Sequence, residues 1–129
     1  MAVDDDSLVL TNTVAMLEDL GHTALAASSA MEALDIIREN AVDLVITDQA
    51  MPQMTGLQLV DAIHREWPAL AVILAAGFAE TAPGEGAGLR KLAKPFTQHE
   101  LAVQVAAAQA KMKSSARVVR LFADRSGGG

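Results

Sequence analysis

Three groups of charged residues in this sequence could do chemistry together. An acidic triplet, Asp4-Asp5-Asp6, follows the opening apolar residues, Asp48 follows a run of apolar or β-branched residues at 44–47, and Lys94 precedes Pro95. Carboxylates that converge repel one another, and a divalent cation such as Mg²⁺ removes that repulsion. With a lysine alongside, such a site suits an anion with several negative oxygens, as in a phosphoryl group. An aspartate placed there can also act as a nucleophile and form an acyl phosphate.

The elements that must position these residues alternate short apolar runs with helical periodicity. We expect strands at 1–3, 22–26, 42–47, 70–74 and 89–93. Strand followed by helix, repeated, predicts parallel strands with right-handed crossovers, and therefore a doubly wound α/β fold. Ligands of open α/β sheets bind at the carboxyl ends of the strands. The acidic triplet, Asp48 and Lys94 are all expected at that edge.

Four helices are expected from their apolar spacing and end signals. Ser7 is the expected cap of the first helix, Gly21 its left-handed stop, and Pro68 ends the third. A loop is expected at 49–56, with Pro52 and Gly56 as breakers and its methionines in packing roles. The residues expected on the buried sides of the four helices are Leu10, Val14 and Leu17; Ala30, Leu34 and Ile37; Val60, Ile63 and Trp67; and Leu101, Val105, Ala108 and Met112.

The segment 76–88 interrupts the alternation. It contains four glycines and Pro83, and it has no apolar stripe. Glycine and proline are the poorest helix formers. We therefore predict a loop, or at most one turn, where a crossover helix would be expected between the last two strands.

Composition and charge narrow the class of protein. The chain has 129 residues, 51% of them apolar and 3% aromatic, with no cysteine for a disulfide or thiolate metal site. Five of the ten bases but only one of the sixteen acids lie after residue 110, so residues 1–110 carry −10 and residues 111–129 carry +4. The acidic body argues against nucleic-acid binding. No apolar run reaches the length of a membrane span and no signal peptide opens the chain, so a soluble cytoplasmic domain is expected.

Three motifs closely resemble those of the response regulator receiver domains of two-component signalling. They are Val3-Asp4-Asp5-Asp6, Thr47-Asp48-Gln49-Ala50-Met51-Pro52 with Gly56 following, and Lys94-Pro95-Phe96. The resemblance covers residues 1–113 and leaves 114–129 as a basic helical extension or tail. It implies a flavodoxin-like, five-stranded parallel sheet of order 2-1-3-4-5 with a shortened or absent fourth helix. The segment 74–96 resembles receivers at the C-terminus of hybrid histidine kinases.

The resemblance also implies roles for individual residues. Asp48 would be the phosphoacceptor and, with Asp5 and the backbone carbonyl of Ala50, a Mg²⁺ ligand, while Asp4 would act through water. Lys94 would bind the phosphoryl oxygens. The phosphoryl donor would be a histidine kinase or histidine phosphotransfer protein, and the domain itself would not be an enzyme. A homodimer is compatible with the family.

Further positions are assigned by the resemblance, and two of them depart from the family pattern. Ala76 and Gly77 would lie beside the phosphoryl group, and a cis peptide bond would precede Pro95. Family members usually have Thr or Ser where this chain has Ala76, and an aromatic residue where it has Lys91. The usual transmission of phosphorylation to the output face is therefore expected to be absent.

Other functions remain open from the sequence. A pseudo-receiver that binds a partner constitutively is favoured by Ala76 and Lys91 and opposed by the intact acids and Lys94. A phosphohydrolase with an aspartate nucleophile would need a second aspartate where this chain has Ala50. The stretch 111–125 allows two interpretations, either cations that favour the end of the last helix, or a continued helix whose apolar residues contact a partner. Those apolar residues are Val118, Val119, Leu121 and Phe122.

Overall fold

A five-stranded parallel sheet forms the centre of the computed structural model, which describes residues 1–77 and 79–110. The strand order is β2-β1-β3-β4-β5, and every neighbouring pair is parallel. The predicted doubly wound fold and its order 2-1-3-4-5 are confirmed. The strands are β1 (Ala2–Val3), β2 (Ala26–Ala27), β3 (Leu44–Asp48), β4 (Ala71–Ala76) and β5 (Arg90–Ala93).

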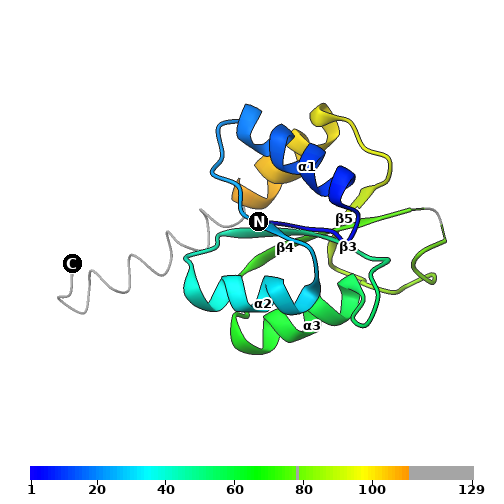
Figure 1. Cartoon of the computed structure of the whole chain (residues 1–129). Helices are drawn as coiled ribbons and strands as arrows, with labels where there is room; N and C mark the ends of the chain where they lie inside the picture. The colour runs from blue at the N-terminus through cyan, green and yellow to red at the C-terminus, as the bar shows by residue number, and fades with distance from the viewer. Residues whose placement is uncertain (78, 111–129) are drawn as a thin grey trace, which may run out of the picture.

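Helices cover both faces of this sheet (Figure 1). The helix α1 (Ser7–Asp19) lies on one face together with a C-terminal helix at 98–110, and α2 (Ala30–Glu39) and α3 (Gly56–Glu66) lie on the other. Between β4 and β5, the described residues form turns and bends and no helix, as predicted for this glycine-rich segment. In the part of the chain that the structure describes, no helix is long and apolar enough to cross a membrane.

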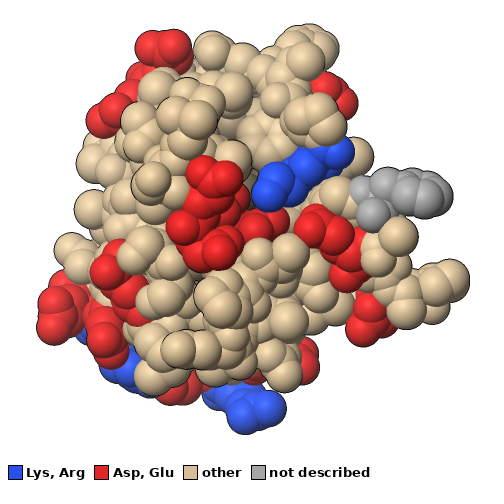
Figure 2. Space-filling view, turned by 45° about the vertical axis from the view of Figure 1, so that its right-hand side comes forward, with Lys and Arg blue, Asp and Glu red and all other residues tan. Residues whose placement is uncertain are grey.

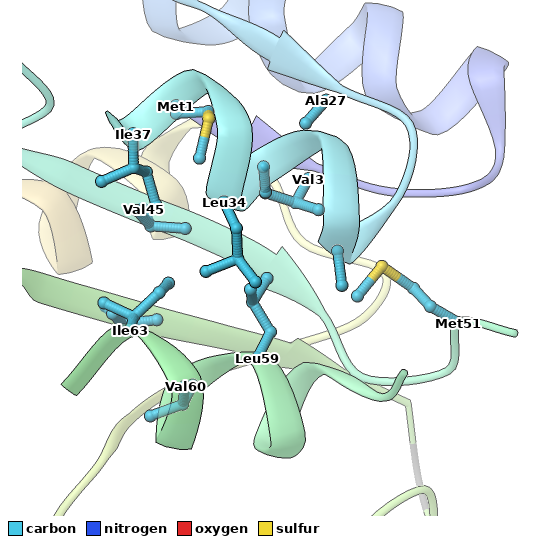
Figure 3. Packing of buried hydrophobic residues seen from close by; sticks show 13 residues of the cluster. Met1, Val3, Ala27, Leu34, Ile37, Val45, Met51, Leu59, Val60 and Ile63 are labelled. Carbon is cyan, nitrogen blue, oxygen red and sulfur yellow. The ribbon is translucent and has the colours of Figure 1, made fainter. Parts of the chain in front are cut away.

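The core consists of two clusters, one on each face of the sheet. Val45 on β3 packs with α2, α3 and Met51 in the first cluster (Figure 3), whereas its neighbour Ile46 packs with Leu17 and Leu101 in the second. Successive side chains of a strand point to opposite faces, so both residues are buried only because both faces are covered. The apolar run Leu44-Val45-Ile46 in β3 follows from this arrangement.

The predicted strand boundaries differ from the structure by one or two residues at most ends, and the second strand and the cap of the first helix differ in kind. The second strand was expected at 22–26 but is only Ala26–Ala27, because β1 offers just Ala2 and Val3 as parallel partners. The cap of α1 is Asp6 and not Ser7, which is the first helical residue. The Asp6 carboxylate accepts hydrogen bonds from the amides of the second and third helical residues, and it serves that position better than a serine one residue later.

The other predicted helix signals agree with the structure. Gly21 has a φ of +92°, as expected of a left-handed stop, and α3 ends at Glu66, before Pro68. The predicted inner residues of the four helices are buried or half-buried, apart from Met112, which lies outside the described residues. The stretch 111–125, with its two interpretations, also lies outside them.

Candidate functional site

The acidic triplet forms the turn between β1 and α1. Asp4 is 6% exposed, and its Oδ1 accepts a hydrogen bond from the backbone amide of Asp6 at 2.9 Å. The side chain of Asp6 caps α1 in turn. Asp5 is exposed. The cap therefore fixes the turn, so that one carboxylate is buried at the edge of the sheet and the next lies at the surface.

Asp48 is the last residue of β3 and is only 4% exposed. The start of α3 packs directly against its backbone, since a Cβ at Gly56 would lie 2.3 Å from the carbonyl oxygen of Asp48. Gly56 is thus the first residue of α3, and the expectation that it would act as a loop breaker was wrong. Its missing side chain permits the close approach. The buried side chain of Gln49 accepts from the amide of Leu57 at 2.8 Å and ties the loop to the helix.

Lys94 reaches the same place from the end of β5. Its backbone amide donates to the carbonyl of Ala76 at 3.0 Å, which extends the β4–β5 pairing by one residue. Its Nζ donates to Oδ1 of Asp48 at 2.8 Å and lies 3.6 Å from Oδ2 of Asp4. The peptide bond between Lys94 and Pro95 is cis, as the resemblance implies.

Three carboxylates converge beside this lysine. One oxygen from each of Asp4, Asp5 and Asp48 can be chosen so that all three lie within 4.8 Å of one another. Figure 2 shows acidic side chains gathered near the middle of one face with a basic side chain directly beside them. Three negative charges face one ammonium group, and hard oxygen donors in this arrangement fit a cation such as Mg²⁺.

Burial and the neighbouring charged groups shift the pKa of Asp48 in opposite directions. Burial raises the pKa of the Asp48 carboxyl most strongly, and the hydrogen bond from Lys94 lowers it by a smaller amount. The neighbouring charges of Asp4 and Glu80 raise this pKa further. The net direction is upward, so the lysine alone does not compensate for a buried carboxylate among like charges.

The charge balance favours the protonated form of Lys94. Burial lowers the pKa of its ammonium group, but the hydrogen bond to Asp48 and the charges of Asp48, Asp4 and Glu80 together outweigh burial and raise it. Lys94 is therefore a fixed positive charge in the site. Such a group can bind an anion without exchanging a proton with it.

Comparisons with known proteins show the family of the chain. A family profile described as the response regulator receiver domain matches residues 1–106. The chain belongs to this family. It is 35% identical over 109 residues to a chemotaxis protein CheY homolog of Campylobacter jejuni, covering 78% of this chain and 84% of that protein.

Longer relatives and solved structures give the same result. The chain is 34% identical over 112 residues to the sensor kinase CckA of Brucella abortus, covering 81% of this chain but only 12% of the kinase. It spans 17% of the transcriptional regulatory protein GlrR of Escherichia coli. A receiver domain protein from Clostridium thermocellum superimposes with a TM-score of 0.80 at 33% identity, over 87% of this chain and 94% of that one. The receiver domain is thus one module of several longer relatives.

The remaining predicted positions of this receiver domain lie at the end of β4, on β5 and in the loop after Asp48. Ala76 ends β4 and Gly77 follows it, both half-buried, whereas Ala50 is exposed two residues beyond Asp48. Lys91 is exposed on β5, and its Nζ donates to the backbone carbonyl of Glu85 at 2.6 Å. The structure thus brings Asp4, Asp5, Asp48 and Lys94 into one cluster and leaves Lys91 in contact with the preceding loop.

One residue of the receiver site was missed by sequence reasoning. Glu80 lies in the glycine-rich segment, yet its charge acts on both Asp48 and Lys94, and its Oε1 accepts from the amide of Gly77. The segment has no periodicity that would place an acid in the site. Only the tight turn after β4 brings this side chain back, and the glycines of the segment predict a loop without indicating where its side chains lie.

Proposed function

We propose that this receiver domain accepts a phosphoryl group on Asp48 from a phosphohistidine. The observation that carries the proposal is the convergence of the carboxylates of Asp4, Asp5 and Asp48 within 4.8 Å, with Lys94 hydrogen-bonded to Asp48. Membership of the receiver family supports the same role. Asp48 has the position and the chemical type of a nucleophile in this cluster.

The chain's own residues divide the work of the transfer. The Asp48 oxygen that Lys94 does not hold attacks phosphorus, the bond from phosphorus to the donor imidazole nitrogen breaks, and its electron pair stays on that nitrogen. Lys94 then neutralises charge on the phosphoryl oxygens. Asp5, Asp48 and the Ala50 carbonyl would hold Mg²⁺, with Asp4 acting through water. The bound cation would supply further charge neutralisation.

The partner that follows from this chemistry is a histidine kinase or a histidine phosphotransfer protein. The likeness to the receiver segment of a sensor kinase supports a place in a phosphorelay. The domain would comprise residues 1–113, with 114–129 as an extension. It would lie in the cytoplasm and would not contact nucleic acid. The domain would be a phosphoacceptor and not an enzyme, because the phosphoryl group stays on Asp48 instead of being released as a product.

The test is the intact mass of the protein after incubation with acetyl phosphate and Mg²⁺. We expect a gain of one phosphoryl group, with acetate as the leaving group. Asp48→Ala and a sample with EDTA should both show no gain. If the mass is unchanged even with a phosphorylated histidine kinase as donor, phosphoacceptance is excluded.

A second candidate is a pseudo-receiver that binds a partner without phosphorylation. Ala76 favours it, since this residue offers no hydroxyl at the end of β4 where the family usually has one. The same experiment separates the two candidates. A protein that never gains phosphate would be a constitutive binding module, and loss of Mg²⁺ binding would point to the same conclusion.

A further inference from the structure

The amide of Gly77 lies at the edge of the sheet that carries the site. Ala76 pairs with Ala93, and its carbonyl accepts from the amide of Lys94 at 3.0 Å, so Gly77 directly follows a residue held against Lys94. The backbone amide of Gly77 is therefore a hydrogen-bond donor one residue beyond the strand pair that ends at Lys94. Such donors are what an anion with several oxygens requires.

This donor already has an anionic partner. Oε1 of Glu80 accepts the hydrogen bond from the Gly77 amide, and the carbonyl of Gly77 accepts from the Glu80 amide at 3.2 Å. The carboxylate also lies against the open side of the glycine, because a Cβ there would be 3.0 Å from Oε1. Glu80 is half-buried. Its carboxylate is therefore held at this amide and does not extend freely into solvent.

The position of Glu80 differs from that of the other acids in the site. The carboxylates that converge for a cation are those of Asp4, Asp5 and Asp48, and Glu80 is not one of this group among the described residues. Glu80 instead lies at the amide of Gly77, and its charge acts on both Asp48 and Lys94. A carboxylate in that place adds negative charge where a phosphoryl group would bring its own.

We propose that Glu80 is a built-in competitor of the phosphoryl group for the Gly77 amide, and that it must move away before that group is fully bound. This inference rests on the proposed function, because it concerns the same site. The hydrogen bond and the charge act in the same direction. Removing Glu80 should therefore strengthen binding of a phosphoryl-like anion.

Beryllofluoride with Mg²⁺ is the probe, with affinity measured by calorimetry. We expect Glu80→Ala to bind it about 10-fold more tightly than the unchanged protein, which corresponds to about 1.4 kcal/mol. Glu80→Gln should lie between the two, because the amide keeps an acceptor but loses the charge. Gly77→Ala should follow Glu80→Ala in direction, since the added methyl group displaces the carboxylate.

Glu85 offers a matched control in the same segment. Its Oε1 accepts from the amide of Ala82 at 2.5 Å, three residues earlier, in the same kind of turn that Glu80 makes with Gly77. Glu85→Gln should leave the affinity for beryllofluoride within about twofold of the unchanged protein. A similar gain in this variant would mean that net charge or loop stability is responsible, and would overturn the proposal.

A second readout follows the donor itself. In nuclear magnetic resonance spectra without anion, the resonance of the Gly77 amide should differ between the unchanged protein and Glu80→Ala. Addition of beryllofluoride should shift this resonance in both proteins. Equal or weaker anion binding by both Glu80 variants, with normal uptake of phosphate on Asp48, overturns this inference alone. If neither the unchanged protein nor the variants bind beryllofluoride or gain phosphate, both the inference and the proposed function fail.

Discussion

At Gly56 the packing of α3 against the end of β3 leaves no room for a side chain. A Cβ would lie 2.3 Å from the carbonyl oxygen of Asp48 and 2.7 Å from Cδ1 of Leu74. The first contact is with backbone, which cannot rotate away. We expect Gly56→Ala to lower the free energy of unfolding by about 3 kcal/mol, at the upper end for overpacked sites. Urea denaturation measures this loss directly.

Gly21 provides the contrast for that experiment. It has a φ of +92° and nothing within 4 Å of an added Cβ, so Gly21→Ala should cost only the backbone strain, about 1 kcal/mol. Gly56→Ala should also slow phosphorylation of Asp48, whose backbone must shift to make room, whereas Gly21→Ala should not. Equal losses of stability in the two variants would contradict the explanation by steric contact.

The buried carboxyl of Asp48 should destabilise the fold when no cation is bound. Burial and the charges of Asp4 and Glu80 raise its pKa in the folded state despite the bond from Lys94. An acid with a raised folded pKa binds its proton more tightly in the folded protein, so stability falls as pH rises through that pKa. In EDTA at pH 7, Asp48→Asn is therefore expected to raise the free energy of unfolding by about 1 kcal/mol.

The same variant should respond differently to pH and to Mg²⁺. The gain from Asp48→Asn should shrink as the pH is lowered toward the unfolded pKa of aspartate, about 4. Mg²⁺ should stabilise the unchanged protein, because a ligand of the folded state adds stability by mass action, and should stabilise Asp48→Asn much less. Thermal denaturation with EDTA or Mg²⁺ tests both points. A variant less stable than the unchanged protein in EDTA would mean that the bond to Lys94 outweighs burial.

At the scale of elements, the start of α3 determines where the loop after Asp48 can lie. Thr55 accepts a hydrogen bond from the amide of Gln58, and the Gln58 side chain accepts from the amide of Thr55 at 2.9 Å. Thr55→Ala removes one half of this capping box and should cost about 1 kcal/mol of stability. Thr55→Ser retains the hydroxyl and should cost much less. Equal stability of the two variants in urea would show that this cap does not hold the helix.

The element scale also shows which features the sequence could predict. The run Val45-Ile46-Thr47 predicts a buried strand, because Val45 packs in one core cluster and Ile46 in the other. This pattern depends only on residues that are adjacent in the sequence. The second strand was misplaced because its length is decided by β1, which has only Ala2 and Val3 to pair with. Its position is determined by pairing with a strand that is distant in the sequence, and hydrophobic periodicity carries no information about that pairing.

The candidate site shows the same division. The acidic triplet, Asp48 and Lys94 could be brought together in advance because each follows a parallel strand, and parallel strands end at one edge. Glu80 could not be placed in the site in advance, because it does not directly follow a strand. A turn closed by its hydrogen bonds with Gly77 brings its side chain to the site. The carboxyl ends of predicted strands indicate only those site residues that directly follow a strand. They do not indicate residues that a loop carries back.

At the scale of the whole molecule, the question is how far a change at Asp48 travels. Ala76 has no hydroxyl with which to follow a phosphoryl group, so the end of β4 has no side-chain bond that would draw it toward the site. On the neighbouring strand, Lys91 is exposed, and its ammonium group is held by the carbonyl of Glu85 at 2.6 Å. We therefore expect that neither Ala76 nor Lys91 carries a change at Asp48 through β4 and β5 to the surface.

We therefore expect phosphorylation to be a local event in this receiver domain. With beryllofluoride and Mg²⁺, amide resonances should shift at 4–6, 48–57, 77–80 and 94, while those of β5 and of 98–110 should change little. Ala76→Thr restores a hydroxyl and is the variant most able to extend the change, with Ala76→Val as its match in size without the hydroxyl. Large shifts across β5 in the unchanged protein would show that it signals by a route that needs neither a hydroxyl at 76 nor an aromatic ring at 91. Shifts confined to the site would mean that a partner must read the phosphoryl group at the acidic edge itself.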